Sequence, residues 1–114
     1  MVNYTSSALD KTFGALSDPT RRAILSRLAR GTATVTEVAE PFDISLPAVS
    51  KHLKVLERAG LLARKKEGRI YHLSLNPSPL SQAADWIQVY ERFWEGQLDV
   101  LANFIENGST EESE

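Results

Sequence analysis

Apolar residues recur at helical spacing along the first half of the chain. Val49, Leu53 and Leu56 stand at i, i+4 and i+7, which places them on one face of a helix that we expect over 46–59. Similar spacing predicts further helices over 8–16 and 19–30. The chain therefore begins as a series of short amphipathic helices.

Polar residues and prolines indicate where these helices begin and end. Ser17 or Asp18 can cap the helix over 19–30, because their side-chain oxygens accept hydrogen bonds from the first backbone N–H groups of a helix. A short third helix follows, and either Thr36 or Thr34 can cap it. Pro41 limits this helix to roughly two turns.

The spacing of apolar residues changes between 61 and 75. Ile70, His72 and Ser74 alternate with their neighbours, which predicts a strand over 70–75, and 61–65 can form its partner. Glu67-Gly68 lies between them and suits a hairpin turn, because glycine adopts a positive φ easily. We expect a two-stranded hairpin whose tip is basic.

A long helical pattern follows Pro79. It runs over 80–106 with an apolar arc too broad for one surface stripe, and 107–114 should be a disordered acidic tail. We expect one domain over 1–106, made of a DNA-binding module over 8–75 and a dimerisation helix over 80–106. The fold is then mainly helical with a small β-hairpin, a dimeric winged helix-turn-helix with about five helices and a two-stranded wing.

Composition narrows the class of protein. The chain has 114 residues and no cysteine, which excludes disulfides, thiolate metal sites and cysteine nucleophiles. It has neither a signal-peptide pattern at Met1–Ser7 nor an apolar run long enough to span a membrane, so we expect a cytoplasmic protein. No nucleophile, acid/base pair or metal cluster stands out, so we expect neither enzyme activity nor a cofactor.

Charge is unevenly distributed along the chain. The net charge is -2, yet residues 1–80 hold 12 Lys and Arg against 7 Asp and Glu. Residues 81–114 hold one basic residue and eight acidic ones. A basic region of this kind indicates an anionic partner for the first part of the chain.

The short third helix, the turn and the helix over 46–59 together form a helix-turn-helix pattern, in which the second helix enters the major groove of DNA. We expect Ser50, Lys51 and His52 to contact base edges or nearby phosphates, although local packing of His52 is also open. Lys54 and Arg58 should meet phosphates, and the hairpin should reach the minor groove or the backbone. The predicted DNA-binding residues are Ser45, Leu46, Pro47, Ser50, Lys51, His52, Lys54, Arg58, Arg64, Lys65, Lys66 and Arg69.

Several of these residues also form a recognisable motif. Residues 48–62 read AVSKHLKVLERAGLL, followed by Glu67-Gly68-Arg69 and preceded by DPTRR at 18–22 and TEVA at 36–39. Over about 8–75 the chain resembles the ArsR family of winged-helix repressors. The resemblance implies an operator-binding homodimer that represses transcription, often of its own operon.

The chain departs from this family in its sensor residues. Well-known members bind metals through cysteines in the first helix of the helix-turn-helix, and others through Asp and His on the last helix. Here 36–41 contains no cysteine and 80–106 contains no histidine. The chain is therefore similar to the metal-independent members of the family.

The aromatic last helix can be intramolecular core, dimer interface or ligand pocket. We favour a dimer interface, because a chain this small has little core in which to bury so many aromatic residues. The predicted interface residues are Leu9, Phe13, Trp86, Tyr90, Phe93, Trp94, Leu98, Leu101 and Ile105. The expected partners are double-stranded DNA with a palindromic operator and a second copy of the chain, while an unidentified small-molecule or protein effector stays open. The alternative function is a protein–protein or RNA interaction module without operator binding.

Overall fold

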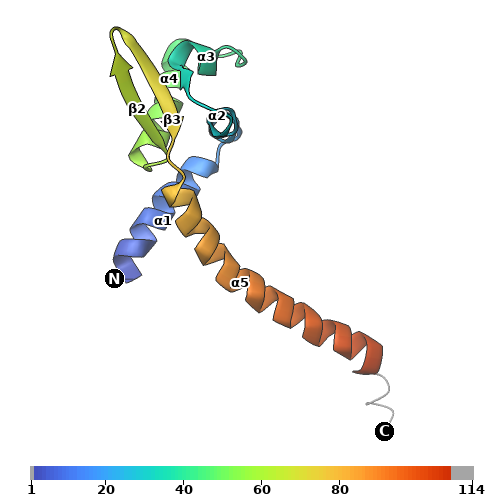
Figure 1. Ribbon diagram of the computed structural model, residues 1–114. Helices are drawn as coiled ribbons and strands as arrows, with labels where there is room; N and C mark the ends of the chain where they lie inside the picture. Colours follow the sequence, from blue (N-terminus) through green and yellow to red (C-terminus); the bar gives the residue numbers. More distant parts are fainter. Residues whose placement is uncertain (1, 109–114) are drawn as a thin grey trace. The chain divides into compact units, whose positions relative to one another are not determined.

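The computed structural model describes residues 2–108. They form, in chain order, α1 (Val2–Leu16), α2 (Pro19–Ala29), β1 (Ala33–Thr34), α3 (Val35–Ala39), α4 (Leu46–Arg58), β2 (Leu62–Glu67), β3 (Ile70–Leu75), α5 (Ser78–Asn103) and a π-helical turn, Phe104–Gly108 (Figure 1). This is the winged helix-turn-helix that the sequence predicts. The chain divides into two compact units, and the boundary between them falls within α5, after Ala83.

The first unit has one apolar core. Val49, Leu53 and Leu56 of α4 are buried, as their spacing predicts. They pack with apolar side chains from α1, α2, α3 and the sheet. The other buried members of this core are Ala15, Ile24, Leu25, Leu28, Ala33, Val38, Leu61, Leu62 and Leu73.

Side-chain caps fix the starts of α2, α3 and α4. The Asp18 carboxylate, not the Ser17 hydroxyl, caps α2 by accepting from the Arg21 backbone N–H at 3.1 Å. Thr34, not Thr36, caps α3, and its hydroxyl accepts a hydrogen bond from the Glu37 backbone N–H at 3.2 Å. The Glu37 carboxylate in turn accepts from the Thr34 N–H at 2.8 Å, which completes a capping box.

The end of α4 leads directly into the wing. Gly60 has φ of 77°, and the N–H groups of Gly60 and Leu61 donate to the carbonyls of Glu57 and Leu56. This is a Schellman motif, in which a residue with positive φ closes the helix. The Asn76 amide group donates to the Gly60 carbonyl at 2.8 Å, so the base of the wing is joined to the end of α4.

The predicted two-stranded wing is present as β2 and β3, and β1 adds a third strand to the sheet that the sequence analysis did not predict. β1 pairs with β3, which also pairs with β2, and both pairings are antiparallel. A two-residue strand has too few positions for an alternating pattern, so β1 leaves no signal in the sequence. The hairpin turn lies at Gly68-Arg69, because β2 continues as far as Glu67.

Two helices are longer at their starts than their apolar patterns suggest. α1 begins at Val2 instead of residue 8, and α5 begins at Ser78 instead of residue 80. A backbone can continue as helix beyond its first buried residue, and periodicity alone does not detect that. The predicted acidic tail, 107–114, lies outside the described residues from 109 onward.

The second unit consists of α5 from Ala84 and the turn that follows it. Every residue over 84–107 is exposed, including the large apolar ones. At 100° per residue, those apolar residues cover roughly half of the helix circumference. No helix among the described residues combines the length and the hydropathy of a membrane span.

Candidate nucleic-acid interface

Helix α4 divides into a buried face and a polar face. Opposite its core residues lie the exposed Pro47, Ser50, Lys51, Lys54 and Arg58. Ser50 and Lys51 are adjacent and the other intervals are three or four positions, so the five residues share one side of the helix. The core contacts therefore hold α4 in place while these polar side chains remain free to meet a ligand.

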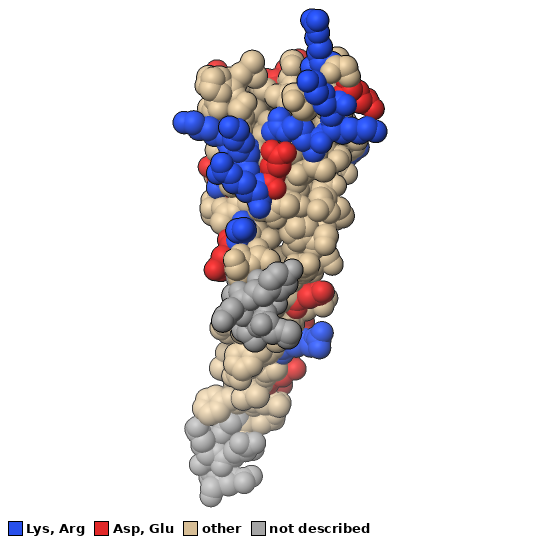
Figure 2. All heavy atoms as spheres, turned by 90° about the vertical axis from the view of Figure 1, so that its left-hand side faces the viewer, with Lys and Arg blue, Asp and Glu red and all other residues tan. Residues whose placement is uncertain are grey.

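Four cations on α4 and the wing have no partner in the part of the chain that the structure describes. Lys51, Lys54, Arg58 and Arg69 make neither an ion pair nor a hydrogen bond there. Figure 2 shows Lys and Arg side chains gathered on one side of the first unit, with fewer Asp and Glu side chains between them. Unpaired cations on one surface favour a polyanion as the ligand.

Other predicted wing cations have partners within the chain. Arg64 donates to both carboxylate oxygens of Glu57 on α4, each at 3.3 Å, and lies 5.3 Å from the Tyr71 ring centre. Lys66 lies 5.7 Å from the same ring, and Lys65 is 3.6 Å from the exposed Glu67 carboxylate. Arg64 thus links the wing to α4, which leaves Arg69 as the unpaired cation at the hairpin tip.

The start of α4 presents apolar side chains to solvent. The Ser45 hydroxyl accepts from the Ala48 N–H at 3.3 Å, and Leu46 is 59% exposed. Ile44, just before the cap, is also exposed, and the sequence analysis did not select it. Its signal was weak, because an isolated apolar residue in a turn is more often packed than exposed.

His52 lies apart from the unpaired cations. Its Nδ1 is 3.2 Å from Nη1 of Arg21 and 3.8 Å from Oδ2 of Asp18, both at the start of α2. The hydrogen bond from the Arg21 backbone N–H, together with the charge of the Arg21 side chain, lowers the pKa of the Asp18 carboxyl. The DPTRR segment therefore has a structural part in the site, which its sequence did not reveal.

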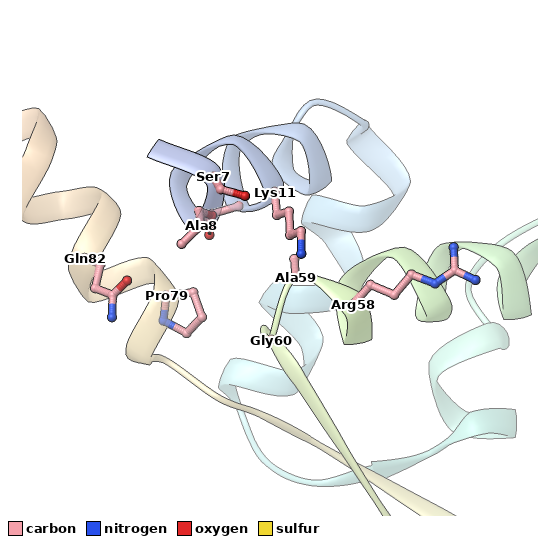
Figure 3. Close-up of a pocket in the computed structure, with 9 residues that line it drawn as sticks. Ser7, Ala8, Lys11, Arg58, Ala59, Gly60, Pro79 and Gln82 are labelled. Carbon is pink, nitrogen blue, oxygen red and sulfur yellow. Dashed lines mark hydrogen bonds between the residues drawn. The ribbon is translucent and has the colours of Figure 1, made fainter. Parts of the chain in front are cut away.

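A hollow of about 280 Å³ lies between α1, the end of α4 and the first turn of α5, within the first unit. Figure 3 shows Lys11 extending toward Ala59, while Arg58, which also lines the hollow, extends along α4 so that its guanidinium points away from Ala59. The Arg58 guanidinium thus stays with the exposed face of α4. No three His, Asp or Glu side chains among residues 2–108 lie close enough together to hold a metal ion.

The residues predicted for a dimer interface are exposed with one exception. Leu9 of α1 is only 8% exposed, while Phe13 lies at the border of the exposed class. The rings of Trp86 and Tyr90 contact each other with their centres 4.6 Å apart and their planes tilted by 45°. These two and the remaining predicted residues form an apolar stripe on α5 and the turn that follows it, made of Phe93, Trp94, Leu98, Leu101 and, in the turn, Ile105.

Known proteins resemble this chain over most of its length. Residues 16–65 match a helix-turn-helix domain family. The chain is 38% identical to the transcriptional repressor SdpR of Bacillus subtilis over 79 residues, which cover 69% of this chain and 88% of the repressor. It is 39% identical to the HTH-type transcriptional regulator Rv2034 of Mycobacterium tuberculosis over 107 residues, covering 94% and 95% of the two chains.

A solved structure agrees with these sequence relatives. The crystal structure of an ArsR family transcriptional regulator superposes with a TM-score of 0.75 at 41% sequence identity, covering 79% of this chain and 93% of the other. At 41% identity the two proteins share their sequence as well as their fold over the aligned residues. α4 is thus the second helix of a helix-turn-helix in this protein too.

Proposed function

The chain belongs to the ArsR family of winged helix-turn-helix transcriptional regulators, and on that basis we propose that it is a homodimeric repressor of its own or a neighbouring promoter. We infer that each protomer places α4 in the major groove of a palindromic operator and its wing beside the adjacent backbone or minor groove. The family regulates transcription and has no enzymatic role. We expect it to act in the cytoplasm, where its operator is accessible.

One observation carries this proposal, namely the unpaired state of Lys51, Lys54, Arg58 and Arg69. A lysine or arginine with no partner in its own chain can neutralise a DNA phosphate and release the counterions condensed on the DNA, which favours binding. Ser50 and Lys51 face outward near the start of α4, where the recognition helices of this class contact base edges. The longer side chains farther along the helix are suited to phosphates.

The apolar stripe of α5 supports the homodimer. Exposed side chains such as Trp94 and Phe93 would be unstable in water over so large an area, and a second copy supplies an equivalent apolar face. A two-fold dimer presents two recognition helices about 34 Å apart, one turn of DNA, which matches a palindromic site. We propose that this stripe is the dimer interface.

We also propose that a metal bound by cysteines is not the signal that releases the DNA. The chain contains no cysteine, so thiolate ligands cannot form. Its two histidines, His52 and His72, both lie in the winged module. An unidentified small-molecule or protein effector stays open as the signal that releases the DNA.

Fluorescence anisotropy with the duplex from the protein's own upstream intergenic region tests the proposed function. We expect nanomolar binding in the presence of excess competitor DNA, with a salt dependence that corresponds to several phosphate contacts. Lys51→Ala should weaken binding about fivefold to tenfold and reduce the salt slope by about one contact. Arg69→Ala should give a smaller loss of the same kind.

Arg30→Ala is the matched control, because Arg30 is another exposed arginine but lies at the end of α2, outside α4 and the wing. It should bind as the unchanged protein does. Loss of affinity in Arg30→Ala equal to that in Lys51→Ala would mean that net charge alone governs binding. Absence of binding even at low salt would contradict the proposed function.

A further inference from the structure

His52 belongs to the recognition helix, but its polar contacts are directed at the start of α2. Its side chain is 22% exposed, and Nδ1 lies 3.2 Å from Nη1 of Arg21. A guanidinium can only donate hydrogen bonds, so in this contact Nδ1 must be the acceptor. In this contact the ring proton therefore lies on Nε2.

Arg21 is itself fixed by contacts on its other sides. Its Nε donates to the Ala15 carbonyl at 2.7 Å, and its Nη2 donates to the Gly14 carbonyl at 3.2 Å. Its backbone N–H is held by the Asp18 cap. The guanidinium thus joins three elements: the end of α1, the start of α2 and, through His52, the middle of α4.

The position of His52 on α4 lets its contact with Arg21 restrict the rotation of this helix about its axis. His52 lies at the border between the buried face around Val49 and the exposed face that carries Lys51. Apolar contacts are non-directional and permit small rotations of a helix about its axis. A hydrogen bond from a fixed guanidinium is directional, so it restricts that rotation and with it the direction of Lys51.

We propose that His52 is a positioning residue for DNA binding, which acts through Arg21 to fix the rotation of α4 and does not itself contact DNA. This inference rests on the proposed function, because its main readout is operator affinity. It assigns His52 the packing role that the sequence left open beside direct DNA contact. It also gives Arg21 of the DPTRR segment a role in recognition.

Two substitutions separate positioning from DNA contact. The amide oxygen of His52→Asn falls near the place of Nδ1 and can still accept from Arg21, whereas the amide of His52→Gln reaches the place of Nε2 instead. By anisotropy on the same duplex, we expect His52→Asn to bind within about threefold of the unchanged protein and His52→Gln to bind about tenfold more weakly. The melting temperature of each variant shows whether it is folded.

A second measurement does not depend on DNA. Two-bond ¹H–¹⁵N NMR spectra of the free protein at pH 8 should show His52 as the neutral tautomer protonated on Nε2. In Arg21→Gln that tautomer preference should weaken. The affinity losses of Arg21→Gln and His52→Gln should also fail to multiply in the double variant, because the two residues act through one contact.

Several results would overturn the proposal. It is wrong if His52→Gln binds DNA as well as or better than His52→Asn, since the Nε2 position would then make the important contact. It is equally wrong if the losses of Arg21→Gln and His52→Gln multiply, or if the Nδ1 tautomer dominates. Failure of the proposed function looks different: neither the unchanged protein nor Lys51→Ala would show specific binding, while the weaker tautomer preference in Arg21→Gln would still report the Arg21 contact.

Discussion

The two units of this chain treat their apolar residues in opposite ways. In the first, Leu53 is 1% exposed and belongs to a core formed by four helices and the sheet. In the second, Trp94 is 61% exposed, and no residue over 84–107 is buried. Both units contain amphipathic helices, but only the first buries an apolar core within one chain, although a few of its apolar side chains, such as Leu46, stay exposed.

This difference shows which unit buries its apolar residues by itself and which unit leaves them exposed to a partner. In the winged unit, the core buries the apolar faces of the helices. The side chains of Asp18, Thr34 and Ser45 accept hydrogen bonds from backbone N–H groups at the starts of α2, α3 and α4. What this unit leaves unsatisfied is charge, on α4 and at the wing tip. The helix after Ala83 leaves apolar surface unsatisfied instead. The first deficit suits a polyanion, and the second suits an apolar partner.

The largest expected effect comes from charging the apolar stripe. Phe93→Glu places a carboxylate near the middle of the stripe, where burial against a second copy would leave it desolvated and unpaired. We expect a monomer by sedimentation velocity at micromolar concentration. Operator affinity should fall about 100-fold, because each protomer then binds only one half-site.

Gln88→Glu is the matched control for Phe93→Glu. It adds the same charge to the same helix, but about 200° around the axis from Trp86, on the polar side. We expect it to remain dimeric and to bind DNA normally. If Phe93→Glu also remained dimeric, the stripe could not be the dimer interface.

A smaller effect, on the free energy of unfolding, distinguishes apolar residues buried within one chain from those exposed on α5. Leu53→Ala removes the same atoms as Leu101→Ala, but Leu53 is buried in one chain whereas Leu101 is 52% exposed. We expect Leu53→Ala to lower the free energy of unfolding by about 2–5 kcal/mol at every protein concentration. The cost of Leu101→Ala should instead appear as a weaker dimer, measured by denaturant unfolding at several concentrations. A concentration-independent loss in Leu101→Ala would show that its side chain packs within its own chain.

The smallest effect concerns a polar contact within the winged unit. The pKa of Asp18 is lowered in the folded protein, so its ionised form stabilises the fold. That stabilisation is complete above the ordinary aspartate pKa of about 3.9 and is lost as the pH falls through the lower pKa of the folded state. Asp18→Ala should therefore lower the melting temperature at pH 7, and the difference from the unchanged protein should shrink at low pH. A difference that stayed constant down to pH 2 would contradict a role for the ionised cap.

Local signals in the sequence determined most of the fold. The i, i+4, i+7 spacing of Val49, Leu53 and Leu56 placed the buried face of α4, and the polar side of the same helix followed from it. Caps, prolines and glycines set most helix ends to within about two residues. These features depend on residues a few positions apart, which is why one sequence suffices to find them.

Contacts between distant residues were decided by the tertiary structure alone. β1 exists because Ala33 and Thr34 pair with Leu73 and His72, about forty positions away in sequence. Arg64 and Lys51 have the same charge, yet only Arg64 has a carboxylate beside it, supplied by α4. His52 meets Arg21 across 31 positions. No local pattern records such meetings, because they depend on how finished helices and strands pack. The sequence by itself thus determined which residues carry charge, and packing decided which of those charges remain available to DNA.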